Sequence, residues 1–451
     1  MTVNVGKAAE AGFIKDLTIS SNQPGGKSVS LLLGFVELRY FESIMDNTVK
    51  ATVLFTDSGD TIDGKTARSG LPIVGEEMVT LKIEDNNKNI LDFSEKKNNE
   101  LYVKKSTPLS EDTRKELIGL TLVSAEDIMN TKVNLTSRFD GKISDSVNRI
   151  LTEGNFKGLG TKKKLDIEST ANTCNKIPNN KHPFFWLNKF STQAVSSTTQ
   201  KLGESAGYFF YETYNGFFFK SIDTLIDQKP KKSFIYNEST DSRGTTVPES
   251  YDGKALTMSS DNRIDAIQKN KIGAYSNRIV TFDPFTTYYE VSKFKADEFE
   301  QGSAYKKGGK NLPKLNTKFK NPDATEDFSR TTYYVLDTGT MPTGDSKEQI
   351  KKSGEQNFEV AKIHNQSMMR YNLLFSQQIT ITIPADFSLH AGDAVFVDTP
   401  EIKDNKNDTV DRQQGGLYII SDLCHLINTK QSLTKMNLVR ESFGRKPKSS
   451  N

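Results

Sequence analysis

Hydrophobic and polar residues alternate along the first third of the chain. Residues 49–55 and 79–83 place apolar side chains at every second position, and residues 29–44 form an extended, largely apolar run. A period near two is typical of half-buried β-strands. Residues 57–69 are rich in Asp, Ser and Gly, which favour turns. Several strands without intervening long helices predict an antiparallel sheet or barrel.

A helical pattern follows over residues 124–206. Ser124 lies three residues before Asp127, which is a loose signal for a helix start, and Ser144 can begin a second helix. Pro183 precedes a third run with apolar residues at helical spacing. This part of the chain therefore predicts a small helical or mixed connector domain.

The clearest local signal is a hairpin. Aromatic runs at 208–211 and 217–219 flank Asn215 and Gly216, a pair that favours a tight turn with positive φ. Aromatic pairs across the two strands would stabilise it. A platform for stacking nucleic-acid bases usually interleaves basic residues, and only Lys220 lies nearby. We therefore interpret the aromatic residues as the core of the hairpin.

Residues 225–375 are more polar and mixed. The pattern predicts a helix over 261–272 and a strand pair at 278–282 and 286–294. Residues 301–320 carry lysines and no acidic residue, and Gly and Pro interrupt any regular element. This basic loop is either a solvated connector or a contact for DNA or an acidic partner. Its lysines are Lys306, Lys307, Lys310, Lys314, Lys318 and Lys320.

Strands return after a predicted helix over residues 360–374. Isoleucine and threonine alternate over 379–383, and further apolar runs follow to residue 439. One of these runs begins after Gly392 with a glycine, an acidic residue, any residue and then two apolar residues. The strand after Gly75 begins in the same way. The repeated pattern is a hint of two duplicated β domains.

Composition and charge exclude several classes of protein. Hydrophobic residues make up 35% of the 451 residues and charged residues 26%, so the chain can bury sizeable cores. The net charge of +3, from 60 basic and 57 acidic residues, is low for a general nucleic-acid binder. No apolar run is long enough for a transmembrane helix, and we expect neither a secretory signal nor stable membrane insertion.

No pattern of catalytic or metal-binding residues stands out. Cys174 and Cys424 are far apart, which predicts no disulfide framework. Residues 154–160 hold three glycines but follow no convincing strand, so a flexible loop is expected rather than a phosphate-binding loop. Glu76 and Glu77 would point to opposite faces of a strand. We expect no catalytic residue, cofactor or metal; none of the histidines has metal-ligand spacing: His182, His364, His390 and His425.

Several segments, in order along the chain, resemble the baseplate hub subunits of T-even-like contractile-tailed phages, and those of cyanophage-type myoviruses most closely. The motifs are structural rather than catalytic, and their order carries the resemblance. Residues 225–360 are the part least covered. The matching segments are residues 34–44, 52–59, 71–77, 207–217 and 415–443.

The resemblance implies a structural virion protein of the phage tail baseplate, assembled in the host cytoplasm, and not an enzyme. Such hubs resemble homotrimeric rings that hold a central spike and continue into the tail tube or tube-initiator proteins. Baseplate wedge proteins lie beside the ring, and the tape-measure protein and DNA pass through its lumen. An alternative function is a host-surface or polysaccharide-binding adhesin, which would more often show repeated strand motifs and surface aromatic clusters.

Together, pattern and resemblance predict a mainly β fold with α+β parts. We expect two tube-like antiparallel β-barrel domains, a small helical domain and an inserted mixed domain. The expected boundaries are 1–123 for the first β domain, 124–206 for the connector, 207–224 with 376–445 for the second β domain, and 225–375 for the insertion with its basic loop 301–320.

Overall fold

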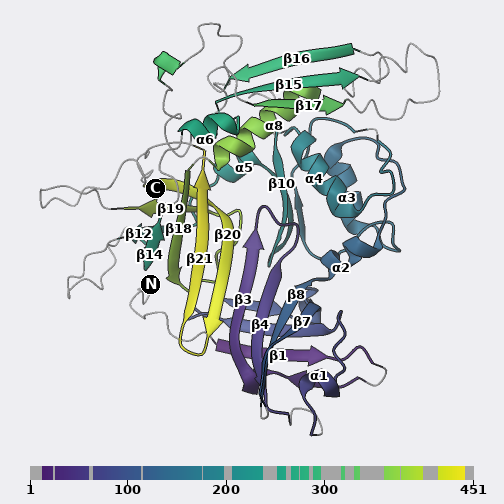
Figure 1. The fold of residues 1–451 in the computed structure, drawn as a ribbon, viewed down its shortest axis with the longest axis vertical. Helices are drawn as coiled ribbons and strands as arrows, with labels where there is room; N and C mark the ends of the chain where they lie inside the picture. Colours follow the sequence, from purple (N-terminus) through teal and green to yellow (C-terminus); the bar gives the residue numbers. More distant parts are fainter. Residues whose placement is uncertain are drawn as a thin grey trace, which may run out of the picture.

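The fold is mainly β, with most of its described helices in the upper half of Figure 1 and one short helix at the lower end. Within the described residues, no helix is long and apolar enough to cross a membrane. The computed structural model describes residues 13–23, 26–59, 64–112, 115–174, 176–197, 206–236, 251–260, 266–273, 275–283, 288–295, 316–319, 330–335, 360–375, 377–399 and 415–441.

Fifteen strands of the described chain form one continuous hydrogen-bonded sheet, in which two groups can be distinguished. The first group follows the order β3-β4-β8-β7-β5-β1-β2, with β6 beside β5, and its pairs are antiparallel. Its strands are β1 (Phe13–Ser20), β2 (Ser28–Ser30), β3 (Phe35–Ser43), β4 (Lys50–Asp57), β5 (Met78–Glu84), β6 (Ile90–Phe93), β7 (Leu101–Glu111) and β8 (Glu116–Ser124).

Alternation places one face of these strands in a core. In β4, Ala51, Val53 and Phe55 are buried, and in β5 Val79, Leu81 and Ile83 are buried. The strands expected from period two are therefore confirmed. Short helices join them: η1 (Leu32–Gly34), α1 (Ala67–Gly70) and η2 (Glu95–Lys97).

The second group follows the order β14-β18-β21-β20-β19-β12-β13 and encloses a separate core around Ile381, Tyr418 and Leu438. β12 runs parallel to β13 and β19, and the other pairs are antiparallel. Its strands are β12 (Lys232–Tyr236), β13 (Gly253–Ala255), β14 (Thr257–Ser259), β18 (Gln377–Pro384), β19 (Ala394–Asp398), β20 (Gly416–Asn428) and β21 (Ser432–Arg440).

The two groups have the same strand order. β3, β4, β8, β7, β5, β1 and β2 correspond in turn to β14, β18, β21, β20, β19, β12 and β13. In each group one segment pairs with the strand at one end of the order and then with the strand at the other end, which closes the group into a ring of strands. Residues 28–43 pair first with β1 and then with β4, and residues 253–259 pair first with β12 and then with β18. The sense of pairing differs at one strand and so in two pairs: β1 is antiparallel to both β5 and β2, while β12 is parallel to both β19 and β13.

Among the described strands, a single pair joins the two groups. The second half of β20 lies antiparallel to β3, with Asp422 opposite Ser43 and Asn428 opposite Glu37. In Figure 1 these two strands lie side by side at the centre of the molecule. The sheet therefore runs without interruption from one group to the other.

The connector contains α2 (Ala125–Lys132), α3 (Ile143–Thr152), β9 (Leu165–Ile167) and α4 (Pro183–Gln193). Pro183 stands in the first turn of α4, as expected. Ser124 lies at the start of α2, but its hydroxyl bonds elsewhere and does not cap the helix. Ser144 does not begin α3 as expected: the helix starts at Ile143, and Ser144 N–H donates to Thr170.

The aromatic hairpin forms as expected, from β10 (Tyr208–Thr213) and β11 (Gly216–Ser221). It does not, however, join the second strand group. β11 pairs with β9, and the three strands form their own sheet in the order β10-β11-β9. Both faces are covered, since every residue of β10 is buried. One face packs with Trp186 and Phe190 of α4. The other face, with Phe209 and Tyr211, packs in a cluster with Ile419 and Val439 of the second strand group, so the hairpin lies between that group and the connector.

The expected insertion over 225–375 is only partly separate. Residues 232–259 supply β12, β13 and β14 to the large sheet, which the sequence pattern did not indicate. Expected helices are present as α6 and α8. The remaining elements are α5 (Ile222–Ile226), α6 (Ala266–Lys271), β15 (Ser276–Asp283), β16 (Tyr288–Lys295), η5 (Thr317–Phe319), β17 (Thr331–Val335) and α8 (Val360–Leu374).

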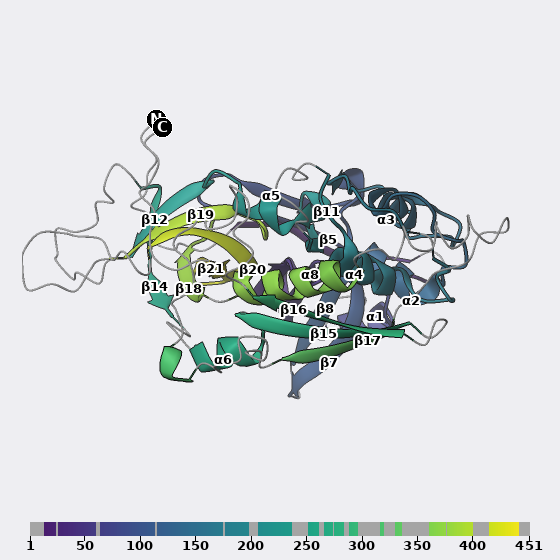
Figure 2. The same cartoon turned by 90° about the horizontal axis from the view of Figure 1, so that it is seen from above.

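β15, β16 and β17 form a third sheet, and α8 lies along one face of it (Figure 2). The strand pair expected around Asp283 is confirmed by the register of β15 with β16. Most of the basic loop, residues 301–315 and residue 320, lies outside the described residues. Within 316–319, every residue is exposed.

Candidate assembly site at the junction of the two strand groups

The carboxylate of Glu42, on β3, connects three parts of the chain. It accepts hydrogen bonds from Tyr214 N–H of the hairpin turn at 2.8 Å and from Ala391 N–H of the loop before β19 at 2.9 Å. His390 Nδ1 lies 3.1 Å from it, and Tyr40 O–H donates at 2.9 Å. The side chain of Glu42 is fully buried. One buried carboxylate therefore holds the first strand group, the hairpin and the second strand group together.

Glu42 and His390 favour their charged forms together. Burial raises the pKa of Glu42, but His390 and the backbone N–H donors outweigh it and lower the pKa below its ordinary value. Burial lowers the pKa of His390, and the Glu42 charge outweighs it and raises that pKa. An ion pair between them follows. His425 behaves differently: burial lowers its pKa to about 4, so its ring stays neutral beside Phe387, 4.7 Å away.

The hairpin turn packs against residues of both strand groups. The Tyr214 ring lies 5.4 Å from Phe93 of β6 and stacks on His390 at 6.2 Å. Its hydroxyl accepts from Asp92 N–H at 3.2 Å, and its carbonyl accepts from the Asn99 amide at 3.1 Å. The aromatic turn therefore fixes the position of one group relative to the other.

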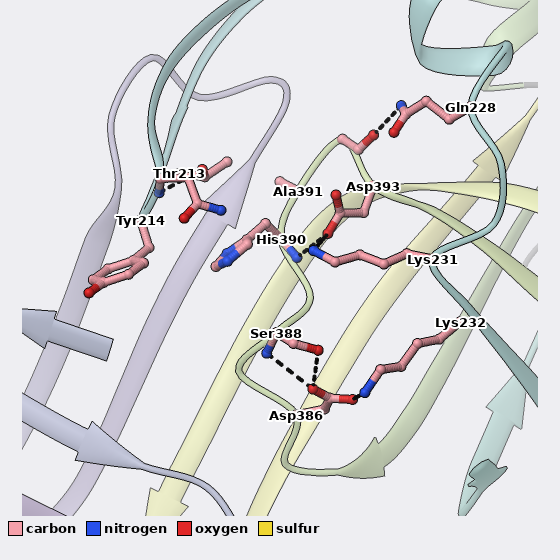
Figure 3. A network of polar contacts seen from close by, with 12 residues as sticks. Thr213, Tyr214, Gln228, Lys231, Lys232, Asp386, Ser388, His390, Ala391 and Asp393 are labelled. Carbon is pink, nitrogen blue, oxygen red and sulfur yellow. Dashed lines mark hydrogen bonds and ion pairs between the residues drawn. The ribbon is translucent and has the colours of Figure 1, made fainter. Parts of the chain in front are cut away.

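Two ion pairs tie residues 385–393 to the start of β12 and the residue before it (Figure 3). Lys231 lies 2.9 Å from Asp393, which also accepts from His390 N–H at 2.8 Å. Lys232 pairs with Asp386. Burial raises the pKa of Asp386, but the Lys232 ammonium outweighs it and lowers the pKa. These contacts hold the loop that presents His390 and Ala391 to Glu42.

The turns before β5 and β19 correspond in the two strand groups, but Gly392 matches Glu76 rather than the expected Gly75. Glu76 N–H donates to Val103 O of β7 at 2.7 Å and Gly392 N–H to Ile420 O of β20 at 2.8 Å, and both backbones are left-handed, with φ of 65° and 86°. In each case an acidic side chain accepts the N–H three residues earlier. Glu77 accepts from Val74 at 2.7 Å, as Asp393 does from His390. The acid equivalent to Asp393 is thus Glu77, so the sequence pattern, which matches Gly75 and Glu76 with Gly392 and Asp393, is out by one residue.

The edge of β20 that pairs with β3 corresponds to an edge of β7 that is partly unpaired in the described chain. β20 uses its edge over 422–428 to pair with β3. Its equivalent, β7, pairs with β5 only at Leu101 and Tyr102, so among the described strands its edge is open beyond Val103. β14 is the equivalent of β3, and among the described strands it pairs only with β18. Within the described strands, β14 and the second half of β7 therefore each have one edge without a partner strand.

The other residues considered in the sequence analysis take part in packing and local hydrogen bonds. Residues 154–160 cap the end of α3, where a Cβ on Gly158 would lie 2.5 Å from Ile150 O. His182 Nδ1 lies 2.9 Å from Val133 O, and His364 packs 4.9 Å from Tyr334. Within the described residues, no three His, Cys, Asp or Glu side chains gather as a metal site requires.

Sequence reasoning missed Glu42 and Tyr214. A signal was present, because Leu38, Tyr40 and Glu42 occupy successive inward positions of β3, and a carboxylate at such a position needs buried partners. The partners could not be found, since they lie far along the chain.

Comparison with known proteins places this fold. No family model and no curated protein matches the sequence. The 43 kDa tail protein of prophage MuSo2 from Shewanella oneidensis has a similar structure, with a TM-score of 0.51 at 10% identity over 95% of this chain and 98% of that chain. A tail protein from Neisseria meningitidis MC58 gives a TM-score of 0.49 at 9% identity over 96% and 97%. The similarity to the MuSo2 tail protein confirms the resemblance to a phage tail protein at the level of the fold.

Proposed function

We propose that this chain is a structural hub subunit of a contractile phage tail baseplate. Each strand group would be a tube-like β-barrel domain, and three chains would form a ring that joins a central spike to the tail tube and lines the DNA channel. The fold shared with the MuSo2 tail protein supports a tail component. The spike, tube and wedge contacts and the lumen contents rest on the sequence resemblance.

One observation carries the proposal. The strand order is repeated in the two groups, but the edge that is paired in one group is open, among the described strands, in the other. Within the chain, β3 of the first group completes the edge of β20 in the second. The corresponding pair, β14 and β7, is not formed within the described chain. Pairing β14 of one subunit with β7 of the next would repeat the internal junction. Three chains would then present six similar units, and their open edges would be covered.

The length of the strands is compatible with this pairing. β14 has three residues, so the pairing needs only a short stretch of β7. Residues 104–107 supply this stretch before Pro108, which lacks a backbone donor. The lysines, bulges and proline of β7 would also protect its edge against unspecific pairing.

The proposed domain division differs from the expected one. The first β domain would span 13–124, and the connector with its hairpin would span 125–221. The second β domain would combine 232–259 with 377–441, and the peripheral part would span 266–375. We propose no catalytic role for any of these.

One observation favours a second candidate function, that of an adhesin. β15, β16 and β17 expose a row of apolar side chains on the face opposite Ile279. The hairpin, by contrast, offers no aromatic surface, because its rings are largely buried. The exposed residues are Phe282, Tyr289, Val291, Tyr333 and Val335.

Mass measurement in solution tests the hub. Light scattering on the purified chain, alone and with the spike protein from a neighbouring reading frame, should give a trimer in at least one condition. Thr382 O accepts the N–H of Leu256, so Thr382 and its register partner Thr257 face each other, and by alternation the N–H of Met258 points away from β18. Met258→Pro should reduce trimer formation, while Met258→Leu should not. A monomer in both conditions would overturn the proposal.

A further inference from the structure

Lys163 lies buried between two carboxylates where the connector meets the first strand group. Its Nζ is 2.5 Å from Glu212 Oε1 and 2.8 Å from Glu126 Oε2. The three side chains are 5%, 1% and 6% exposed. Lys163 precedes β9, Glu212 lies on β10 and Glu126 on α2. An amine and two carboxylates therefore share one site that is closed to bulk water.

The two oxygens of Glu212 have different partners. Oε2 accepts hydrogen bonds from Val49 N–H at 3.0 Å and from Ser124 O–H at 2.8 Å. Oε1 faces the amine of Lys163. A pair of fixed donors on one oxygen, with a nucleophile beside the same carboxyl group, is the arrangement that stabilises the oxyanion in acyl transfer.

Glu126 is placed to move protons at Lys163. Its Oε2 contacts Nζ, and its Oε1 accepts from Thr161 O–H at 2.5 Å, which fixes the carboxylate. The ring of Phe217 lies 5.7 Å from Nζ and contributes an apolar wall. A structural ion pair would need one carboxylate for one ammonium, whereas this site holds a second carboxylate beside the amine.

We propose that Lys163 and Glu212 form an intramolecular amide cross-link. Glu126 accepts a proton from the ammonium, and the freed lone pair of Nζ attacks Cδ of Glu212. The C–N bond forms, the C–Oε1 bond breaks, and Oε1 leaves as water. Two of the three ammonium protons pass by way of Glu126 to that water, and the third stays on the amide nitrogen. No oxidant, reductant or cosubstrate is needed.

The protonation of the site permits a slow reaction. Burial and the Glu126 charge raise the pKa of Glu212 to about 7 against the opposing effect of Lys163, so Oε1 takes up a proton from the ammonium more readily than an ordinary carboxylate does before it leaves as water. Burial lowers the pKa of Lys163, but the two carboxylates outweigh it and raise that pKa, so the free amine is the minor form. The step occurs once per chain, and fixed contact supplies a high effective concentration.

The cross-link would join the segment before β9 to the hairpin whose turn reaches Glu42. It is a single self-modification and involves no turnover. It is independent of the proposed ring, because all of its groups lie within one chain.

Intact-mass spectrometry of the denatured full-length chain tests the proposal. The wild type should be lighter than its sequence by one water molecule, and a digest should contain a branched peptide joining Lys163 to Glu212. Lys163→Arg keeps the positive charge but cannot form the amide, so it should have its full mass. Glu126→Gln should convert more slowly over a time course. Lys220, which pairs with the half-exposed Asp166 at 2.6 Å, gives a matched control. Lys220→Arg should still lack one water.

Two results would overturn the cross-link. One is a wild-type chain that is folded by circular dichroism and retains its full mass after prolonged incubation at neutral pH. The other is a loss of water that persists in Lys163→Arg. Light scattering on the same samples reports the oligomeric state separately, so failure of the cross-link and failure of the ring can be distinguished.

Discussion

The buried carboxylate of Glu42 accepts the backbone N–H of Ala391 at 2.9 Å, although 349 positions separate the two residues in the chain. The bond links β3 to the loop before β19, and the same carboxylate also receives the hairpin turn. The stability of the junction should therefore depend strongly on this one side chain.

Replacement of Glu42 should destabilise the protein markedly. Glu42→Ala leaves His390 and two backbone N–H groups without their buried acceptor, and removing one partner of a buried ion pair costs about 3–5 kcal/mol. Urea unfolding measures the loss. Glu37→Ala is the control, because Glu37 pairs with a half-exposed Arg39 at 2.7 Å, and such a pair contributes about 1 kcal/mol or less. Equal losses in the two variants would contradict the role of Glu42.

Stability should depend on pH through His390. Its pKa is raised in the folded state above the ordinary 6.5, so its contribution is fully present below pH 6.5 and is lost as the pH rises through the folded value. The lowered pKa of Glu42 acts in the other direction: its contribution is present above the ordinary 4.5 and is lost as the pH falls through the folded value. The pair should therefore stabilise most between these two ordinary values.

The comparison of wild type with His390→Gln isolates this effect. The difference in the free energy of unfolding should be larger at pH 5.5 than at pH 8, where the wild-type imidazole has begun to lose its proton. His425, whose pKa is lowered to about 4, acts in the opposite sense, because the unfolded chain takes up its proton first as the pH falls. Because the His390 charge is one of the effects that lower the pKa of His425, the comparison is repeated in proteins that both carry His425→Gln. A difference that does not change with pH would contradict the ion pair.

Gly392→Ala should be more destabilising than Gly75→Ala. Both substitutions put a Cβ on a left-handed backbone, which costs about 1–2 kcal/mol. At Gly392 the new Cβ would also lie 2.2 Å from Tyr211 Oη, while at Gly75 its nearest neighbour is Val103 O at 3.9 Å. Tyr211→Phe should recover part of the loss in Gly392→Ala, because it removes that oxygen. A double-mutant cycle on thermal unfolding measures the coupling, and additive losses would argue against the contact.

The purified chain should not hydrolyse peptidoglycan or polysaccharide. The sequence offers no catalytic motif, and the proposed role is structural. Release of reducing ends or of soluble fragments is measured against a known cell-wall hydrolase. Robust release by the chain alone, which survives further purification, would show that the structural assignment is incomplete.

Local patterns predicted much of the fold. Alternation located β4, β5 and β18, and Asn215 with Gly216 located the hairpin. The similar openings at Gly75 and Gly392 pointed to two strands that hold the same place in the order of their groups. In each of these cases, the signal lies within a few neighbouring residues.

The rest depended on partners that are distant in sequence. β13 and β14 have three residues each, too few to show a period, and so the closure of the second group could not be predicted. β10 is buried throughout, so it has no polar face from which its sheet could be inferred. For Glu42 the inward position was visible, but its partners come from the hairpin turn and from the loop before β19.

The pairing of β3 with β20 also constrains biosynthesis. Ser43 and Asp422 lie 2.7 Å apart in the folded protein and 379 positions apart in the chain, so the ribosome must complete almost the whole polypeptide before this edge can close. Until then the nascent first strand group exposes an unpaired edge to every other chain on the polysome. Dense translation of the same message would therefore favour premature pairing between neighbouring nascent chains, and slower expression or a chaperone that covers β3 should increase the yield of correctly folded protein.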